Sequence, residues 1–240
     1  MFRRFRIVVL LYILILVGGG AWLTRTDSTD WQEPLWVLVY PINADHSNAA
    51  DTYIENLERE HFSAIEQFFR RQGQTYGLEL DRPVTVRVAA SLFVSPPSPP
   101  LTGGTFSVIW WSLKLRYWVW TIERRQIEPR ADIKVFALFH DLKKLKYLPH
   151  SLGLQKGLIG VVHAFSAVHM SESNNVIIAH EIMHTVGASD KYDPKSGQPI
   201  YPDGYAEPKL NPRYPQSNAE VMGGRRSEEH TSELQSRAYL

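Results

Sequence analysis

The chain of 240 residues is long enough for one well-packed domain, and hardly for two once its apolar N-terminal segment is set aside. Its 26 Lys and Arg residues nearly balance its 25 Asp and Glu residues, and the net charge of +1 gives no reason to expect nucleic acid as a partner. Cysteine is absent, which excludes disulfides and thiolate metal sites and leaves His, Asp and Glu as possible metal ligands.

The N-terminal segment has the composition of a membrane anchor. Three arginines lie among the first six residues, and an uncharged apolar run follows from Ile7 to Leu23. As a helix this run would be about 25 Å long, slightly short of a usual span. We predict a cytoplasmic stub and transmembrane helix at 1–26, with the rest of the chain on the extracytoplasmic side. The alternative is a cleaved signal peptide, with 7–17 as its apolar core and small residues at 18–21, which would give a secreted domain.

Four stretches of the following chain have strand patterns. Residues 36–42 and 133–139 are continuous apolar runs, typical of buried strands. Residues 83–89 alternate valines with other residues, which predicts a strand with one buried face. The apolar stretch 157–169 is a candidate for a last strand.

A helix and a loop are predicted between these strands. Residues 50–76 have apolar residues at helical spacing. The inner face of this helix would consist of Phe62, Ile65, Phe68 and Phe69. The proline-rich segment 95–100 predicts an exposed loop, because consecutive prolines remove hydrogen-bond donors and fix an extended backbone.

Lys114 and Arg116 interrupt the apolar stretch 106–122, so a second membrane span is not expected there. The overlapping stretch 110–125 combines aromatic and basic residues. Its tryptophans are Trp110, Trp111, Trp118 and Trp120. We interpret the stretch as a helix that packs on the core and keeps a solvated basic edge. The alternative is a helix that lies against a membrane surface, with its cations near anionic headgroups.

A metal-binding motif occupies residues 180–184, with the sequence His-Glu-Ile-Met-His. Apolar residues at spacings of three and four, with Ser171 or Ser173 as the expected N-cap, place it on a helix. His180 and His184 would then lie one turn apart on one face and could bind one ion. Glu181 leaves the helix about 100° away, so it can act as the general base beside a metal-bound water.

The third ligand is expected to come from the loop after the helix. Gly187 can adopt positive φ and end the helix abruptly, so that Asp190 returns towards the two imidazoles. The substitutes that remain open are Asp193, Glu207 and Glu220. The other histidines lack ligand spacing and are predicted to be structural or surface residues: His140, His150, His163 and His169.

The pattern from His180 through Gly187 to Asp190 resembles the extended zinc motif of the metzincin metalloproteases, in which a snapalysin-like minority has Asp as the third ligand. The segment 219–223 also resembles the turn that places a methionine beneath the metal in that clan, with Met222 as a hydrophobic support and not a ligand. The resemblance implies Zn²⁺ as the cofactor and an α+β fold, with a mixed sheet and an active-site helix beneath a cleft.

We therefore expect a membrane-anchored zinc metalloendopeptidase that acts on protein or peptide substrates, with the metalloprotease domain at 27–223. By the same resemblance, 164–168 would provide an edge strand that holds the substrate extended. The alternative is a non-catalytic anchored module with a structural zinc site. Residues 224–240 are polar and charged without apolar periodicity, which predicts a disordered or non-native tail. The natural substrate and the oligomeric state stay open.

Overall fold

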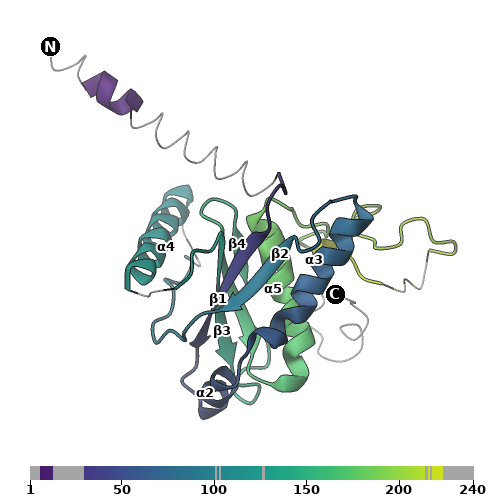
Figure 1. Ribbon diagram of the computed structural model, residues 1–240, viewed down its shortest axis with the longest axis horizontal. Helices are drawn as coiled ribbons and strands as arrows, with labels where there is room; N and C mark the ends of the chain where they lie inside the picture. The colour runs from purple at the N-terminus through teal and green to yellow at the C-terminus, as the bar shows by residue number, and fades with distance from the viewer. Residues whose placement is uncertain are drawn as a thin grey trace.

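The computed structural model describes residues 6–12, 30–100, 102, 104–125, 128–213, 216 and 218–223. From residue 30 onward these residues form a mixed five-stranded sheet with helices on both faces (Figure 1). The predicted α+β class with a mixed sheet is confirmed.

The sheet has the strand order β2-β1-β3-β5-β4. Its strands are β1 Leu35–Asn43, β2 Val84–Val88, β3 Ile133–His140, β4 Leu152–Leu154 and β5 Ile159–Phe165. β1 pairs in parallel with β2 and β3, and β3 pairs in parallel with β5. β4 runs antiparallel to β5 and, as the last strand in this order, forms one edge of the sheet.

The helices divide between the two faces of the sheet. They are α2 Asn48–Glu55, α3 Ser63–Thr75, α4 Thr105–Arg125 and α5 Ser171–Thr185, with single 3₁₀ turns at η1 Arg59–Phe62, η2 Val168–Met170 and η3 Val221–Gly223. Helices α3 and α5 share one hydrophobic cluster with the sheet, and α4 packs in a second cluster. Figure 1 shows α4 alone on its side of the sheet.

Side chains of the central strands alternate between these two clusters. In β1, Val37 and Val39 pack on the side of α3 and α5, whereas Leu38 and Tyr40 pack on the side of α4. Tyr40 also stacks on Phe136 of β3 at a ring-centroid distance of 5.1 Å. Because helices cover both faces, both sides of a strand must be apolar, which explains the continuous apolar runs at 36–42 and 133–139. Those two strand predictions and the strand at 83–89 are confirmed.

The single helix predicted over 50–76 is wrong in its continuity. The chain forms α2, then the turn η1, then α3. Asn56 caps α2 by donating its side-chain amide to the carbonyl of Thr52 at 2.7 Å, and Glu58 caps η1. The inner face is confirmed, because its four predicted residues are all buried: Phe62, Ile65, Phe68 and Phe69.

Three further differences concern the strands before α5. The predicted strand at 157–169 ends at Phe165, after which the chain turns through η2. β4 was not predicted, because three residues with a central glycine give no periodic signal. The predicted edge strand at 164–168 is also wrong, since Phe165 ends a strand that pairs with β3, and β4 forms the edge.

Most of the predicted membrane segment lies outside the described residues. Of the run 7–23, the structure describes only residues up to 12, which are helical and have exposed apolar side chains. None of the helices in the described ranges is both long and apolar enough to cross a bilayer, so the predicted transmembrane helix has no support there. The predicted tail at 224–240 falls wholly outside the described residues.

Candidate metal centre

Helix α5 carries the His-Glu-Ile-Met-His motif and is buried along most of its length. Asn174 fixes its first turn to the sheet: its side-chain amide donates to the carbonyl of Phe165 at 2.9 Å and accepts from the N–H of Phe165 at 3.0 Å. The expected serine N-cap is wrong. Met170 occupies the N-cap and makes no side-chain capping bond, because α5 continues directly from the turn η2.

Gly187 ends α5 and directs the chain back towards the motif. Its φ of 100° lies in a region that residues with a Cβ rarely adopt. Its N–H donates to the carbonyl of His184 at 3.1 Å, and the N–H of Ala188 donates to the carbonyl of Met183 at 2.9 Å. These bonds satisfy carbonyls of the last helical turn. The predicted turn is confirmed, and it brings Asp190 beside the two imidazoles.

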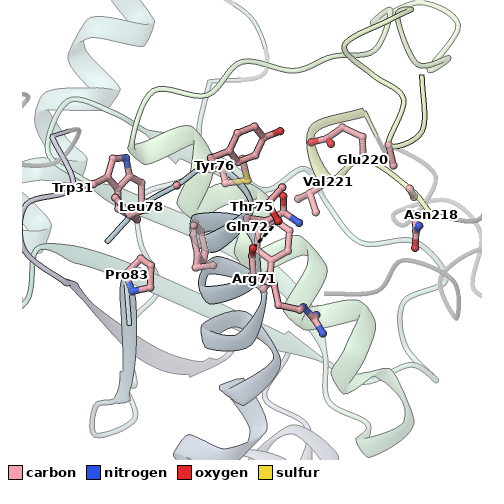
Figure 2. A pocket seen from close by; sticks show the side chains of 17 residues that line it. Trp31, Arg71, Gln72, Thr75, Tyr76, Leu78, Pro83, Asn218, Glu220 and Val221 are labelled. Carbon is pink, nitrogen blue, oxygen red and sulfur yellow. Dashed lines mark hydrogen bonds between the residues drawn. The ribbon is translucent and has the colours of Figure 1, made fainter. Parts of the chain in front are cut away.

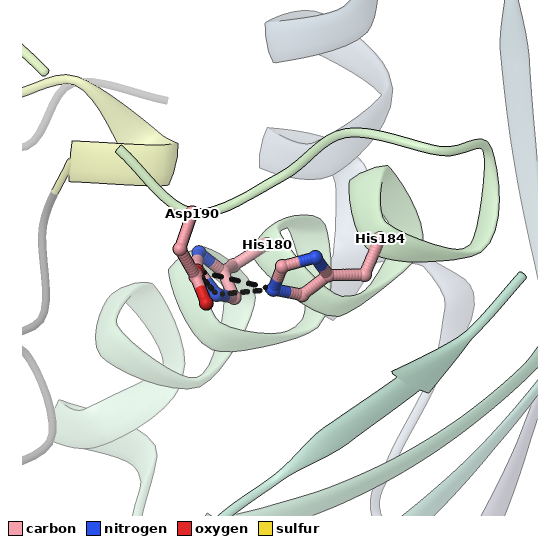
Figure 3. A group of neighbouring side chains, drawn as sticks. All are labelled: His180, His184 and Asp190. Carbon is pink, nitrogen blue, oxygen red and sulfur yellow. Dashed lines mark hydrogen bonds and ion pairs between the residues drawn. The ribbon is translucent and has the colours of Figure 1, made fainter. Parts of the chain in front are cut away.

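Three side chains meet at one point above α5 (Figure 3). The Nε2 atoms of His180 and His184 are 3.0 Å apart. Oδ1 of Asp190 lies 3.3 Å from Nε2 of His180 and 3.2 Å from Nε2 of His184. This group can hold a metal ion, and it consists of the three residues predicted from the motif.

The spacing of these atoms would allow one small ion to contact all three. Zinc bound at about 2.0–2.1 Å by nitrogen and oxygen separates neighbouring ligand atoms by about 3.3–3.4 Å. The three observed separations lie between 3.0 and 3.3 Å. Calcium prefers longer bonds and six to eight oxygen ligands, which this group does not supply.

Main-chain carbonyls hold both imidazoles in the orientation that ligation requires. Nδ1 of His180 lies 3.0 Å from the carbonyl oxygen of Val221, and Nδ1 of His184 lies 2.9 Å from that of Ala188. A carbonyl only accepts, so each Nδ1 carries the proton and donates it. Each Nε2 is then left with a lone pair directed at the metal position.

The environment of His180 favours its neutral form, which is the form that can bind a cation. Burial is the main cause that lowers its pKa, and the nearby His184 lowers it further, against the opposing effects of the Val221 carbonyl and Asp190. The triad is still open to solvent on one side, because the Asp190 side chain is 40% exposed. The two histidine side chains are more buried, with 14% and 19% of their surface exposed.

The substitute ligands considered from sequence do not join this group. Asp193 accepts hydrogen bonds from the backbone N–H groups of Lys195 and Ser196. Glu207 accepts from the N–H of Asn218. Glu220 accepts from the N–H of Met222, and its burial raises its pKa. None of the three lies within ligand distance of both imidazoles in the described residues.

The turn η3 lies next to the metal centre, as the predicted methionine turn requires. The Val221 carbonyl binds His180, and the Met222 carbonyl accepts from the N–H of Lys191 at 2.8 Å. Met222 is buried in the cluster shared with α3 and α5. These contacts connect η3 both to a motif histidine and to the residue after Asp190.

The predicted base, Glu181, is buried on α5 beside the edge strand β4. Only 3% of its surface is exposed. Gly153 of β4 lies against both Glu181 and His184, because a Cβ built on it would be 3.1 Å from the carboxylate Oε2 of Glu181 and 2.5 Å from the Cβ of His184. The edge strand can therefore approach the metal-binding helix only because residue 153 lacks a side chain.

Replacing Gly153 with alanine is expected to lower the free energy of unfolding by about 1–3 kcal/mol, which is the usual effect of overpacking a well-packed site. The new methyl group would also overlap the Glu181 carbonyl, which the helix cannot move cheaply. Urea unfolding of both variants measures the effect, with Gly160→Ala as the matched control. Gly160 is the residue that Gly153 faces on β5, and a Cβ there meets only Val135 at 3.5 Å. Equal stability of the two variants would contradict the tight packing.

A pocket of about 1050 Å³ is lined by residues of the C-terminal half of α3 and by Val221 of η3 (Figure 2). Its apolar lining includes Trp31, Phe69 and Met183, and Val221 also lines it. Because the carbonyl of Val221 binds His180, the pocket and the metal centre share a wall.

A second pair of neighbouring histidines was not predicted from the sequence. Nε2 of His140 lies 2.9 Å from Nδ1 of His163, on the neighbouring strands β3 and β5. Burial, and then the proximity of His140, lowers the pKa of His163 to about 4. Their separation of 23 positions in sequence gave no spacing signal, and only the parallel pairing of two separate strands brings them together.

Comparison of the sequence with protein-family models and with curated proteins gave no match.

Proposed function

We propose that this chain is a zinc-dependent endopeptidase of the metzincin-like kind. The single observation that carries the proposal is the convergence of two imidazole nitrogens and one carboxylate oxygen within 3.3 Å of one another. A buried glutamate on the same helix, next to one of the imidazoles in sequence, supports it.

Three features of the donor set favour zinc in an open, catalytic site. The ligand atoms are two nitrogens and one oxygen, which zinc accepts readily, and the sequence offers no thiolate. Structural zinc sites have four protein ligands, whereas catalytic sites have three and keep one position for water or substrate. The group found among the described residues contains three ligands, and one of its members is well exposed.

The chain's own residues account for the remaining chemistry of peptide hydrolysis. A bound zinc ion would supply a Lewis acid that polarises the scissile carbonyl and makes water more acidic. Glu181 would accept a proton from the attacking water and return it to the leaving amine as the carbon–nitrogen bond breaks. His180 and His184 would keep their protons on Nδ1, where the backbone carbonyls hold them.

The position of β4 favours an extended peptide as the substrate. β4 forms the edge of the sheet, and its Gly153 packs against Glu181 and His184. A peptide added to such an edge by main-chain hydrogen bonds would run past the metal centre. The antiparallel edge strand beside the metal-binding helix also supports the fold that the metzincin resemblance implies.

The proposed location on the extracytoplasmic side of a membrane depends on the apolar run at 7–23 and its preceding arginines. Both readings of that segment, an anchor and a cleaved signal peptide, place the metal centre outside the cytoplasm.

Metal removal tests the proposed function directly. The purified full-length chain is analysed for bound metal and assayed on an unstructured protein substrate before and after treatment with a zinc chelator. We expect cleavage to fall at least about ten-fold on chelation and to return with stoichiometric zinc. Zinc held by the chain without any cleavage would favour a structural site, and cleavage unchanged by chelation would contradict the metal mechanism.

A further inference from the structure

Helix α4 has two apolar faces, of which one is packed. The packed face consists of Trp111, Leu115, Val119 and Ile122, and it closes the cluster on its side of the sheet. The packing of this face agrees with the prediction from sequence that α4 is a helix that packs on the core. A helix of this kind is expected to carry polar residues on its opposite side.

The opposite side of α4 is apolar as well. Six large apolar residues recur along it at spacings of one, three and four: Phe106, Ile109, Trp110, Leu113, Tyr117 and Trp120. Their exposed fractions run from 45% at Trp120 to 88% at Phe106. At 100° per residue, all six fall within a stripe of about 100°, directly opposite the packed face. We call this stripe the outer face of α4.

Basic residues border the outer face. Arg124 lies over the Trp120 ring at 4.4 Å, and Lys114 lies over the Trp110 ring at 5.7 Å. Arg116 donates to the carbonyl of Lys156 at 2.9 Å. The one acidic residue in the sequence of α4, Glu123, is paired with Lys134 at 2.9 Å. The border of the outer face is therefore positively charged.

We propose that the outer face of α4 lies on a lipid bilayer that contains anionic headgroups. Tryptophan and tyrosine prefer the boundary between headgroups and acyl chains, and lysine and arginine beside them attract anionic lipids. A helix of 21 residues is about 31 Å long and could lie flat in that boundary along its whole length. The positive border gives the charge complementarity that identifies an anionic surface as the occupant.

Two further observations agree with a lipid surface. The apolar run at 7–23 of the same chain would hold the domain near a membrane. The loop that contacts α4, in which the Pro97 carbonyl accepts from Nε1 of Trp111 at 2.7 Å, also exposes apolar residues, with Phe93 95% and Val94 49% exposed. This proposal does not depend on the proposed enzymatic function.

Fluorescence quenching by brominated lipid tests the contact. The full-length chain is combined with vesicles of phosphatidylcholine and phosphatidylglycerol, in which the acyl chains are brominated or not. We expect bromine to quench the parent protein, and the quenched fraction to fall at least about two-fold in the double variant Trp110→Phe/Trp120→Phe. The matched control is Trp118→Phe, because Trp118 is on the same helix but packs on Phe136 at 4.7 Å. Its quenched fraction should be no lower than that of the parent, because the tryptophan removed is not in contact with lipid.

The quenched fraction distinguishes the outer face from the N-terminal run, whose own Trp22 stays in every variant. A quenched fraction in the double variant that is equal to or higher than that of the parent would show that Trp110 and Trp120 lie outside the lipid and would overturn the proposal. Equal unfolding temperatures of the variants exclude a loss of fold as the cause.

A charge-reversal experiment tests whether the contact depends on anionic headgroups. In the double variant Lys114→Glu/Arg125→Glu, the concentration of brominated phosphatidylglycerol vesicles needed for half-maximal quenching should rise at least about ten-fold. The reason is that each cation near the surface contributes about 1 kcal/mol to binding. The control Arg71→Glu/Arg82→Glu changes exposed charges elsewhere, on α3 and before β2, and should leave this concentration unchanged. A concentration-dependent dimer without lipid that the Trp110→Phe/Trp120→Phe change dissociates would instead assign the face to a second copy and overturn the proposal.

Discussion

Replacing Glu181 with glutamine is expected to reduce peptide hydrolysis by about 100-fold to 10,000-fold, the usual contribution of a positioned general base. Glutamine has nearly the same shape as glutamate, so the buried site beside Gly153 can accept it without a change of packing. Its amide cannot accept the proton from water as a carboxylate does. The proposed metal ligands His180, His184 and Asp190 are unchanged, so any zinc that the parent binds should remain at the parent level.

The measurement is the rate of cleavage of an unstructured protein at equal zinc content. Glu172→Gln is the matched control, because Glu172 lies exposed in the first turn of the same helix, far along it from the histidines. It should cleave at the parent rate. A Glu181→Gln variant that holds zinc and cleaves as fast as the parent would exclude Glu181 as the base. Loss of zinc in that variant would assign the carboxylate to metal binding instead.

Replacing Asp190 with alanine is expected to weaken zinc binding by more than about 100-fold. Loss of a residue that only supports a ligand costs about 10-fold to 100-fold, and removal of a ligand should cost more. Asp190→His should retain most of the affinity, because an imidazole nitrogen is also a good zinc ligand and the backbone turn at Gly187 still returns the side chain to the site.

Competition with a coloured zinc chelator measures these affinities. The matched control is Asp193→Ala, which removes an acid from the same loop whose carboxylate accepts from the backbone N–H groups of Lys195 and Ser196. Its zinc affinity should stay within about two-fold of the parent. If Asp190→Ala bound zinc as tightly as the parent and Asp193→Ala did not, the third ligand would have been assigned to the wrong residue.

The metal centre could be predicted from sequence because it is local. His180, Gly187 and Asp190 lie within eleven consecutive residues, and the helical period and the turn at one glycine fix their relative positions. The buried strands β1 and β3 could be predicted equally well, because a sheet with helices on both faces requires continuous apolar runs in its strands. In these parts, local pattern and final structure agree.

The parts that could not be predicted depend on distant segments. Val221 supplies the carbonyl for His180 across 41 positions of sequence, and no side-chain pattern marks a backbone acceptor. Gly153 belongs to a three-residue strand that exists only because β5 pairs with it. The outer face of α4 was ambiguous for another reason: an apolar stripe on each side of a helix gives a weak overall periodicity, so sequence alone could not separate the packed stripe from the exposed one.

The two carbonyl acceptors beneath the imidazoles have a consequence for how this site tolerates variation. Ala188 and Val221 act through main-chain oxygens, so exchanging their side chains should matter little as long as the backbone path is kept. Insertions, deletions or prolines in either loop would instead rotate a histidine ring away from the cation. Chains that differ widely at these two positions could thus share the same arrangement of His180 and His184, whereas a change in loop length would disturb it.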